Sequence, residues 1–430
     1  MYSPETAFYS RAAIKILQEK KLHDLLAYVN KYSPFYRKLF SSLEINAEEI
    51  KSLEDFSCFP TTSKEDLQKH NWDFLCVDRK EIVEYTTTSG TLGSPVTIVL
   101  NENDLDRLAY NEFTSFLCAD GSSSDIYQLM ITLDRQFMAG MAYYCGLRKL
   151  GAGIIRLGPS IPGLQWESIR RLKPSAIVAV PSQIMKLIEY GKENNSDINE
   201  TSVKKAICIG ESIRNADLSL NTLGRKINES WSIKLYSTYA STEMQTAFTE
   251  CKEGKGCHHQ PELLIVEILD DDNRHVAPGE IGEVTITTLG VEAMPLLRYR
   301  TGDMCYYINE PCACGRNSLR LSPVLGRKKQ LIKLKGTTIY PPALFDILNE
   351  MEDVRDFIVE VFSNELNTDE VLLHIVPANN PDNCDQKIKS NLQARLRVIP
   401  LINYITLEEI LAMQKKDGGR KAVKFFDRRK

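Results

Sequence analysis

The chain of 430 residues has no excess of charge of one sign and no long apolar run. Its 53 lysines and arginines nearly balance 57 aspartates and glutamates, and the formal net charge of −4 gives no reason to expect binding to nucleic acid or to a membrane surface. No apolar segment approaches the ~20 residues that span a bilayer. Residues 1–21 also lack the basic and then apolar build of a secretory signal. We therefore expect a cytoplasmic protein with no nucleic-acid or membrane partner.

The cysteines lack the even, regular spacing that is typical of a disulfide framework. Eleven of them are scattered along the chain, which favours a reducing compartment with free thiols or a metal site. An apolar fraction of 43% and a charged fraction of 26% are ordinary for a globular protein. A chain of this length exceeds one ordinary core, so two or three domains are expected.

Short apolar runs alternate with helical patterns up to about residue 240. Residues 7–40 predict one or two helices, and the patterns at 165–172 and 183–190 predict further ones. Strands separated by helices indicate βαβ units and a largely parallel sheet. The expected strands are 127–132, 153–157, 175–180, 205–209 and 233–236. The segments 263–269 and 282–288 instead predict an antiparallel hairpin.

The pattern changes after residue 326. A helix at 341–350 precedes strands at 356–362 and 371–376, and a helix at 386–397 precedes a short strand at 404–406. We therefore predict an α/β protein with two domains. A large N-terminal domain (1–326) would hold mainly parallel sheets and a β-subdomain, and a small α+β domain (327–430) would follow.

The segment 85–96, YTTTSGTLGSPV, combines hydroxyl side chains with glycines ahead of a β-branched run. Small residues let backbone N–H groups converge on an anion, and the hydroxyls add donors. The spacing is not that of a Walker A motif. The pattern indicates a polyphosphate-binding loop, with a plain surface turn as the alternative.

Further clusters suit nucleotide chemistry, although each has a structural alternative. Glu243, in YASTE after an expected strand, could hold a divalent cation, or be an ordinary surface acid. Asp303, in RYRTGD, could bind ribose hydroxyls or form a structural pair with an arginine. Arg327 lies in a basic segment that could equally be an ordinary turn. Lys421, in GGRKAVKFF, could neutralise a phosphoryl transition state or belong to a solvated tail.

Two short segments are rich in metal-ligand residues. The first, ECKEGKGCHHQPE, holds Cys251, Cys257, His258 and His259, and the second, PCACGR, holds Cys312 and Cys314. Together they could close a tetrahedral Zn²⁺ site of the Cys₃His type. Reduced surface thiols are the alternative.

A segment after LDRQ supplies candidates for an apolar ligand pocket. Glycine and alanine beside aromatic residues suit a flat apolar ligand, and an ordinary buried helix face explains them equally well. Asp134 and Arg135 could contact a polar substituent or form a surface ion pair. The candidate pocket residues are Phe137, Met138, Ala139, Gly140 and Tyr143.

The joint occurrence and order of these motifs resembles the adenylate-forming superfamily of acyl-CoA ligases, firefly luciferase and peptide-synthetase adenylation domains. Within it the chain is similar to the phenylacetate–CoA ligase family, from about residue 20 to the C-terminus. The motifs are LLAYVNKYSPFYRKLF, FPTTSKEDL, TTSGTLGSP, GES, YASTE, RYRTGD, GRKKQLIKLKGTTIYP and RKAVKFFDRR.

The resemblance implies a role for each matching residue. A flexible loop around the β- and γ-phosphates of ATP would comprise Thr87, Thr88, Ser89, Gly90, Thr91 and Gly93. Gly210, Glu211 and Ser212 would lie along the adenine. In the segment Tyr239, Ala240, Ser241, Thr242, Glu243, the tyrosine would stack near the base or acyl group, the threonine would contact the α-phosphate and the glutamate would bind Mg²⁺. Asp303 would bind the ribose beside Arg327, Lys329 would be the hinge, and Lys421 would be the mobile catalytic lysine of a mobile C-terminal domain.

The implied activity is formation of an acyl-adenylate from a carboxylic acid and ATP, and transfer of the acyl group to coenzyme A, with AMP and pyrophosphate released. Loading of a carrier-protein phosphopantetheine is the alternative, and a non-catalytic nucleotide-binding protein is a third. The helical N-terminus is compatible with a homodimer. For zinc, relatives imply Cys251, His258, Cys312 and Cys314 as ligands, with Cys257 and His259 as bystanders.

The chain departs from the family pattern at two places. Ser94 stands where many relatives have lysine, so a cationic phosphate contact is expected to be missing. The segment QKKDGGR makes Lys415 and Lys416 alternatives to Lys421 as the mobile lysine.

Overall fold

The computed structural model describes residues 2–88, 96–334, 337–363, 369–379, 381–396, 398–414 and 423–429. The chain divides into two compact units. Unit 1 comprises Met1–Leu220, Gly224–Thr301 and Cys305–Val324, and unit 2 comprises Asn221–Leu223, Gly302–Met304 and Leu325–Lys430. The boundary at residue 326 and the mobility of the C-terminal part stay predictions.

The main sheet of unit 1 has the strand order β13-β14-β9-β8-β7-β6-β5-β3-β4. The five expected strands are present and pair in parallel, which confirms the predicted α/β class. These strands are β3 (Ile126–Leu129), β4 (Gly153–Arg156), β5 (Ala176–Ala179), β6 (Lys205–Cys208) and β7 (Lys234–Ser241). Antiparallel pairs extend the sheet through β8 (Thr246–Glu250), β9 (Cys257–His258), β14 (Arg320–Leu321) and β13 (Tyr307–Ile308).

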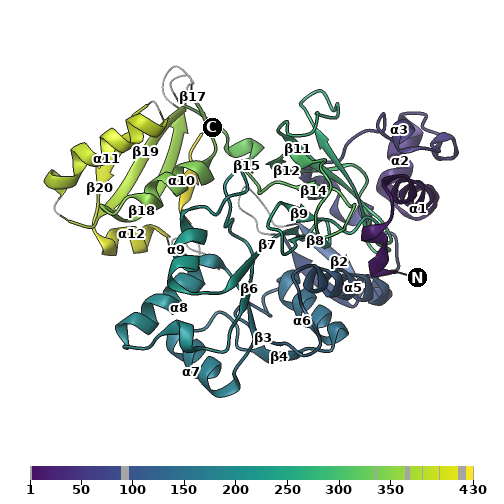
Figure 1. Cartoon of the computed structure of the whole chain (residues 1–430). Coiled ribbons are helices and arrows are strands. Elements are labelled where there is room, and N and C mark those ends of the chain that lie inside the picture. The colour runs from purple at the N-terminus through teal and green to yellow at the C-terminus, as the bar shows by residue number, and fades with distance from the viewer. Residues whose placement is uncertain are drawn as a thin grey trace. The chain divides into compact units, whose positions relative to one another are not determined.

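Helices cover both faces of the parallel strands, as Figure 1 shows. On one side lie α7 (Pro162–Leu172) and α8 (Pro181–Glu193), and on the other α5 (Glu102–Cys118) and α6 (Met138–Leu150). Burial on both faces explains why β5 reads AIVA with every residue buried. A capping box of Asn101 and Asp104 starts α5. A Cβ on Gly146 would lie 2.3 Å from Cβ of Glu112, so glycine permits the close approach of α5 and α6.

A second sheet contains the antiparallel hairpin that the sequence predicts. β10 (Leu264–Leu269) pairs with β11 (Gly282–Thr288), from Leu264 opposite Thr288 to Leu269 opposite Glu283. β12 (Tyr299–Cys305) and β15 (Gly326–Arg327) continue this sheet. A two-stranded sheet of β1 (Glu84–Thr87) and β2 (Thr97–Leu100) stands apart from it.

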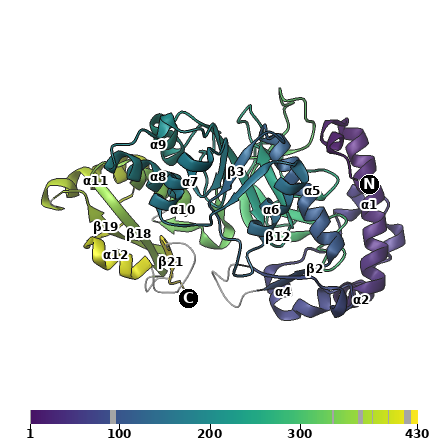
Figure 2. The ribbon, with the colours of Figure 1, turned by 90° about the horizontal axis from the view of Figure 1, so that it is seen from below.

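The predicted N-terminal helices are also present. They are α1 (Arg11–Tyr32) and α2 (Pro34–Ser42), with α2 at the lower end of α1 on the right of Figure 2, followed by α3 (Leu53–Phe56) and α4 (Lys64–His70). An aromatic cluster holds them to the core, with Phe35 stacked on Phe74 at 4.0 Å between ring centroids. No helix within the described ranges is long and apolar enough to cross a membrane.

Unit 2 has the expected α+β character. Its sheet has the order β20-β19-β18-β21, formed by β18 (Val354–Ser363), β19 (Asp369–Pro377), β20 (Leu401–Tyr404) and β21 (Phe425–Asp427). A hairpin of β16 (Ile332–Leu334) and β17 (Thr337–Ile339) precedes it. The helices are α10 (Pro341–Glu350), α11 (Pro381–Leu396) and α12 (Leu407–Gln414), with α9 (Thr222–Ser230) starting among the residues of unit 2. The prediction of a last strand at 404–406 was wrong, because parallel pairing with β19 places that strand at Leu401–Tyr404 and two elements follow.

Candidate functional site

The base of the predicted phosphate loop is closed by the β1–β2 hairpin. Thr87 pairs with Thr97, and the backbone N–H of Thr88 donates to the carbonyl of Val96 at 3.0 Å. The buried Thr88 hydroxyl accepts a hydrogen bond from the Val96 N–H at 3.1 Å. The hairpin therefore fixes both ends of the segment. Outside the described residues lie Ser89, Gly90, Thr91, Gly93 and Ser94.

A strained turn lies beside this loop base. Arg135 and Gln136 both have left-handed backbones, with φ of 58° and 56°. The Gln136 carbonyl accepts a hydrogen bond from the Thr87 N–H at 3.2 Å. Consecutive non-glycine residues in this region cost free energy and cluster at ligand-binding turns. This hydrogen bond therefore holds the turn before α6 against the end of β1.

Packing accounts for three of the five pocket candidates. Met138 and Tyr143 are buried, and the Tyr143 hydroxyl lies 3.3 Å from the Thr238 hydroxyl. Burial raises the pKa of Tyr143 well above its usual range, so this hydroxyl stays neutral. A Cβ on Gly140 would come within 2.1 Å of the Thr132 carbonyl, so glycine is needed there for packing. Of the five, Phe137 and Ala139 keep partly exposed surface.

The acidic motif caps the hairpin of β7 and β8. The expected strand at 233–236 was too short, because pairing with β8 extends β7 to Ser241 and includes Tyr239 and Ala240. The turn therefore begins at Thr242. The Glu243 carboxylate is partly exposed and accepts a hydrogen bond from the Tyr299 hydroxyl at 3.5 Å.

Tyr239 has a defined aromatic neighbour. Its ring stacks on Phe248 of β8, with 5.5 Å between centroids and 29° between planes. The register places these two residues directly opposite each other. Stacking across the hairpin therefore fixes the orientation of Tyr239.

A buried arginine that the sequence did not reveal holds the residue after this turn. The Arg107 side chain is 1% exposed and donates to three carbonyls, those of Gln245 at 2.9 Å, Leu263 at 2.7 Å and Leu289 at 2.8 Å. Gln245 itself has a left-handed backbone with φ of 49°. Burial lowers the pKa of Arg107, but a guanidinium stays charged in proteins. Arg107 therefore clamps the chain two residues beyond Glu243.

The predicted adenine segment follows β6 and is tied to helix α8. Gly210 has φ of 70°, a conformation that favours glycine. The Glu211 carboxylate accepts hydrogen bonds from the Ser182 N–H and hydroxyl, each at 2.9 Å. This carboxylate therefore caps the first turn of α8 and fixes the segment in place.

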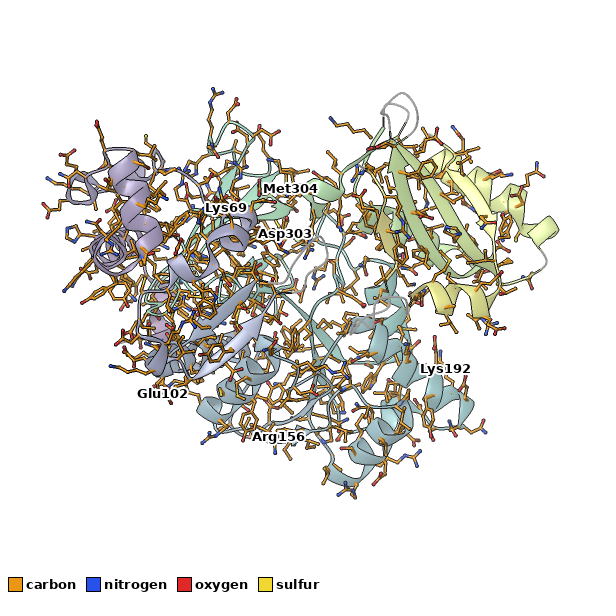
Figure 3. The ribbon with its side chains drawn as sticks, turned by 180° about the vertical axis from the view of Figure 1, so that it is seen from behind. Lys69, Glu102, Arg156, Lys192, Asp303 and Met304 are labelled. Carbon is orange, nitrogen blue, oxygen red and sulfur yellow. The ribbon has the colours of Figure 1, made fainter. Side chains whose placement is uncertain are left out.

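In unit 2, Asp303 and Arg327 face each other across β12 and β15. The Nε atom of Arg327 lies 3.3 Å from Oδ1 of Asp303, which is 8% exposed. Figure 3 labels Asp303 beside Met304 in β12. The Lys329 carbonyl accepts a hydrogen bond from Nη2 of Arg429 at 2.9 Å. Lys421 and its alternatives Lys415 and Lys416 lie outside the described residues.

The structure brings four metal-ligand side chains of unit 1 together. Their ligand atoms all lie within 4.8 Å of one another, and they belong to Cys251, His258, Cys312 and Cys314. The Sγ atoms of Cys251 and Cys312 are 3.6 Å apart, and Sγ of Cys314 is 3.4 Å from Nε2 of His258. A tetrahedral site with metal–sulfur bonds of about 2.3 Å spaces its ligand atoms by roughly 3.5–3.8 Å. The donor set and its spacing therefore fit Zn²⁺.

Neighbouring groups orient this cluster. Nδ1 of His258 lies 3.3 Å from the Ser318 hydroxyl, as expected for a histidine whose other nitrogen faces a metal. Cys257 donates instead to the Ser237 carbonyl at 3.6 Å, and Nδ1 of His259 lies 3.1 Å from the Leu319 carbonyl. The bystander residues therefore have partners of their own.

The protonation states of the cluster are set mainly by burial. Burial lowers the pKa of His258 to about 3, so its ring is neutral and offers a lone pair at pH 7. Burial raises the pKa of Cys251. For Cys314 burial also acts upward, but hydrogen bonds from Arg316, Cys312 and Cys251 outweigh it and lower the pKa. Metal binding would therefore release protons from the thiols.

A fourth sulfur lies beside the three of the cluster, and sequence spacing did not indicate it. Cys118, at the end of α5, is buried against Cys251 and Cys312 and donates to the Thr249 carbonyl at 3.4 Å. Cys118 is far from the cluster in the sequence. Its hydrogen-bond partner Thr249 lies 131 residues later, just before the first ligand, Cys251. Only the packing of α5 against β8 brings Cys118 there.

Comparisons with known proteins place these features in context. The model of the family described as AMP-binding enzyme matches residues 40–293. The phenylacetate-coenzyme A ligase of Thermus thermophilus is 29% identical over 380 residues, 87% of this chain and 84% of that protein. The Escherichia coli phenylacetate-coenzyme A ligase is 26% identical over 349 residues, 79% of this chain and 77% of that protein.

Solved structures show the same fold. A crystal structure of 2-hydroxyisobutyryl-CoA ligase in its postadenylation state, in complex with 2-HIB-AMP, superposes with a TM-score of 0.86. It is 22% identical, and the match covers 99% of this chain and 91% of that one.

Proposed function

Because the chain belongs to the family of AMP-binding enzymes, we propose that it activates a carboxylic acid with ATP and transfers the acyl group to coenzyme A. The products are AMP, pyrophosphate and an acyl-CoA thioester. The family expected from the sequence motifs is confirmed by the match over residues 40–293. The relatives named phenylacetate-coenzyme A ligase support the same class of reaction.

The position of the Glu243 carboxylate is the structural observation that best supports this proposal. Its carboxylate follows the carboxyl end of parallel strand β7 and is partly exposed, with Tyr299 beside it. In open α/β sheets ligands bind outside the carboxyl ends of the strands. Glu243 is therefore the group that we assign to Mg²⁺ bound to ATP.

The chemistry requires such a carboxylate. A carboxylate substrate and the α-phosphate of ATP are both anions, so their approach is opposed by repulsion. Glu243 would hold Mg²⁺, whose charge would offset that of the phosphates and of the transition state. The Thr88 backbone and hydroxyl fix the loop base, and we assign to Thr242 the contact with the α-phosphate. We assign to Lys421 the stabilisation of the negative charge that develops in the transition state of the first half-reaction.

For the acid, we infer an aryl carboxylate of the phenylacetate class. The relatives' names support this choice, and the partly exposed Phe137 and Ala139 supply apolar surface at the start of α6. Met138, Gly140 and Tyr143 are buried in the same helix.

For the metal cluster, we propose a structural Zn²⁺ held by Cys251, His258, Cys312 and Cys314. Four protein ligands leave no open position for catalysis. Metal analysis of the purified protein is expected to find one zinc per chain, and Cys312→Ser should lose it. A wild-type protein free of zinc after purification without chelators would contradict this assignment.

Cytoplasmic location and a homodimer belong to the proposal as well. The eleven cysteines are all free thiols in the structure, which suits a reducing compartment. Light scattering of the purified protein would give the oligomeric state.

The test of the function is exchange of labelled pyrophosphate into ATP, screened over a panel of carboxylic acids. Exchange with an aryl acid, and thioester formation when coenzyme A is added, is the expected result. Exchange without a coenzyme A thioester would point to a carrier-protein acceptor. Absence of exchange with every acid would favour a non-catalytic nucleotide-binding protein.

A further inference from the structure

A buried ion pair in unit 1 connects the predicted adenine segment to the metal cluster. Arg214 comes two residues after Ser212, and Glu250 comes directly before Cys251. Nη2 of Arg214 donates to Oε2 of Glu250 at 3.0 Å, and Nε donates to Oε1, so the pair is bidentate. The Glu250 side chain is 1% exposed. A charge this deeply buried depends on its partner.

Arg214 also organises the segment that it follows. Its backbone N–H donates to the Ser212 hydroxyl at 3.2 Å, and that hydroxyl donates to the Arg214 carbonyl at 2.9 Å. Nη1 donates to the Leu218 carbonyl at 2.9 Å. The segment after Gly210 is therefore tied to the Arg214 backbone through Ser212 and to its side chain through the Leu218 carbonyl.

The first metal-ligand turn lies against the same guanidinium. The Gly254 N–H donates to the Cys251 carbonyl at 3.0 Å and closes the turn, with φ of +63° at Gly254. A Cβ at Gly254 would lie 2.5 Å from Nη2 of Arg214. The guanidinium therefore lies between the Glu250 carboxylate and the turn that begins at Cys251. A metal bound through Cys251 would hold that turn in position.

We propose that Arg214 is a positioning residue that couples the metal cluster to nucleotide binding by the segment Gly210–Ser212. Loss of the metal loosens the Cys251–Gly254 turn, Arg214 and Glu250 lose their support, and the adenine segment loses its fixed conformation. Binding of ATP then weakens, while binding of the acid and coenzyme A does not change. The proposal rests on the proposed function, because that function assigns the adenine to these residues.

The first experiment compares Arg214→Met with a matched surface control, Arg171→Met. Arg171 pairs with Glu167 on the exposed face of α7, with both side chains more than 60% exposed (64% and 63%). Isothermal titration calorimetry with ATP should show an affinity lower by roughly two- to thirtyfold in Arg214→Met and unchanged in the control. The KM for ATP should rise by a similar factor, with the KM for acid and for coenzyme A unchanged.

The second experiment removes the metal from wild type and from Arg214→Met with a chelator. In wild type, metal removal should lower the ATP affinity as the substitution does. In Arg214→Met it should have little further effect, because both changes disturb the same contacts and their effects are not additive. Independent, additive losses would overturn the coupling, and so would normal ATP affinity in folded Arg214→Met.

A conservative variant covers the case in which Arg214→Met does not fold. Arg214→Lys keeps the charge but lacks the planar fork, so it should give an intermediate ATP affinity. ATP affinity equal to that of wild type would contradict the positioning role. A wild-type protein that binds ATP but supports no pyrophosphate exchange would count against the proposed function and leave the positioning test intact.

Discussion

Glu112 should make the stability of unit 1 fall as the pH rises. This residue of α5 is 3% exposed and packs against Gly146 of α6. One carboxyl oxygen accepts a hydrogen bond from Asn111 at 3.1 Å, and the other has no partner among the described residues. Burial raises the pKa of Glu112 from 4.5 to about 8, so the folded protein holds this proton at neutral pH.

The pKa difference fixes the sign and size of the effect. Below pH 4.5 the carboxyl is protonated in the folded and unfolded states, and the shift has no effect on stability. Between pH 4.5 and about 8 the unfolded state ionises while the folded state does not, so the free energy of unfolding falls with rising pH. A shift of 8 − 4.5, or 3.5 pKa units, corresponds to about 5 kcal/mol in total.

Glu112→Gln removes this titration while keeping a side chain of similar size. Relative to wild type, the variant should gain about 3 to 4 kcal/mol in free energy of unfolding between pH 5 and pH 8. Urea unfolding followed by tryptophan fluorescence is the assay, because Trp72, Trp166 and Trp231 all lie in unit 1. Glu167→Gln, the same substitution at an exposed position of α7, is the matched surface control. If the Glu112→Gln curve runs parallel to wild type across this range, the buried carboxyl is not protonated in the folded state and the reasoning is wrong.

Two further predictions concern the reaction. Tyr299→Phe removes the hydroxyl that contacts Glu243 and should weaken the binding of Mg²⁺ by roughly tenfold. The measurement is the Mg²⁺ dependence of pyrophosphate exchange. An unchanged Mg²⁺ dependence would show that Tyr299 does not orient Glu243. Lys421→Ala should abolish adenylation but spare thioester formation from a supplied acyl-adenylate, measured in separate half-reaction assays. Equal loss of both half-reactions would contradict a lysine that acts in the first step alone.

The parallel strands could be predicted because each is a local signal. Runs such as AIVA at Ala176–Ala179 are apolar throughout and bounded by turn residues, and burial on both faces needs that composition. β9 and β14 could not be found this way, because each has two residues and exists through pairing with the other. β21 likewise depends on pairing with β18, which lies more than 60 residues earlier, at Val359 opposite Phe425. Local patterns cannot report such long-range contacts.

The site divides along the same line. Motif order indicated the residues around Thr88, Glu243 and the four cysteine and histidine ligands, because their chemistry is local and their types are unusual. Arg107 was missed, since its three carbonyl partners lie 138 to 182 residues away and a single arginine in an amphipathic helix carries no signal. Cys118 was missed for the same reason. Residues that position others are thus harder to predict than residues that react.

Two arginines hold the β7–β8 hairpin, the buried Arg107 and the largely buried Arg214. The hairpin tip carries Glu243, and its register runs from Ser241 opposite Thr246 to Thr238 opposite Thr249. Arg107 holds the chain just beyond the tip through the Gln245 carbonyl, and Arg214 holds the far end through Glu250, next to the ligand Cys251. In the proposed function, a hairpin fixed at both ends would hold the Glu243 carboxylate in place before nucleotide binds, which is the condition for electrostatic catalysis. Loosening either end should therefore reduce activity even though neither arginine is assigned a contact with a reacting atom.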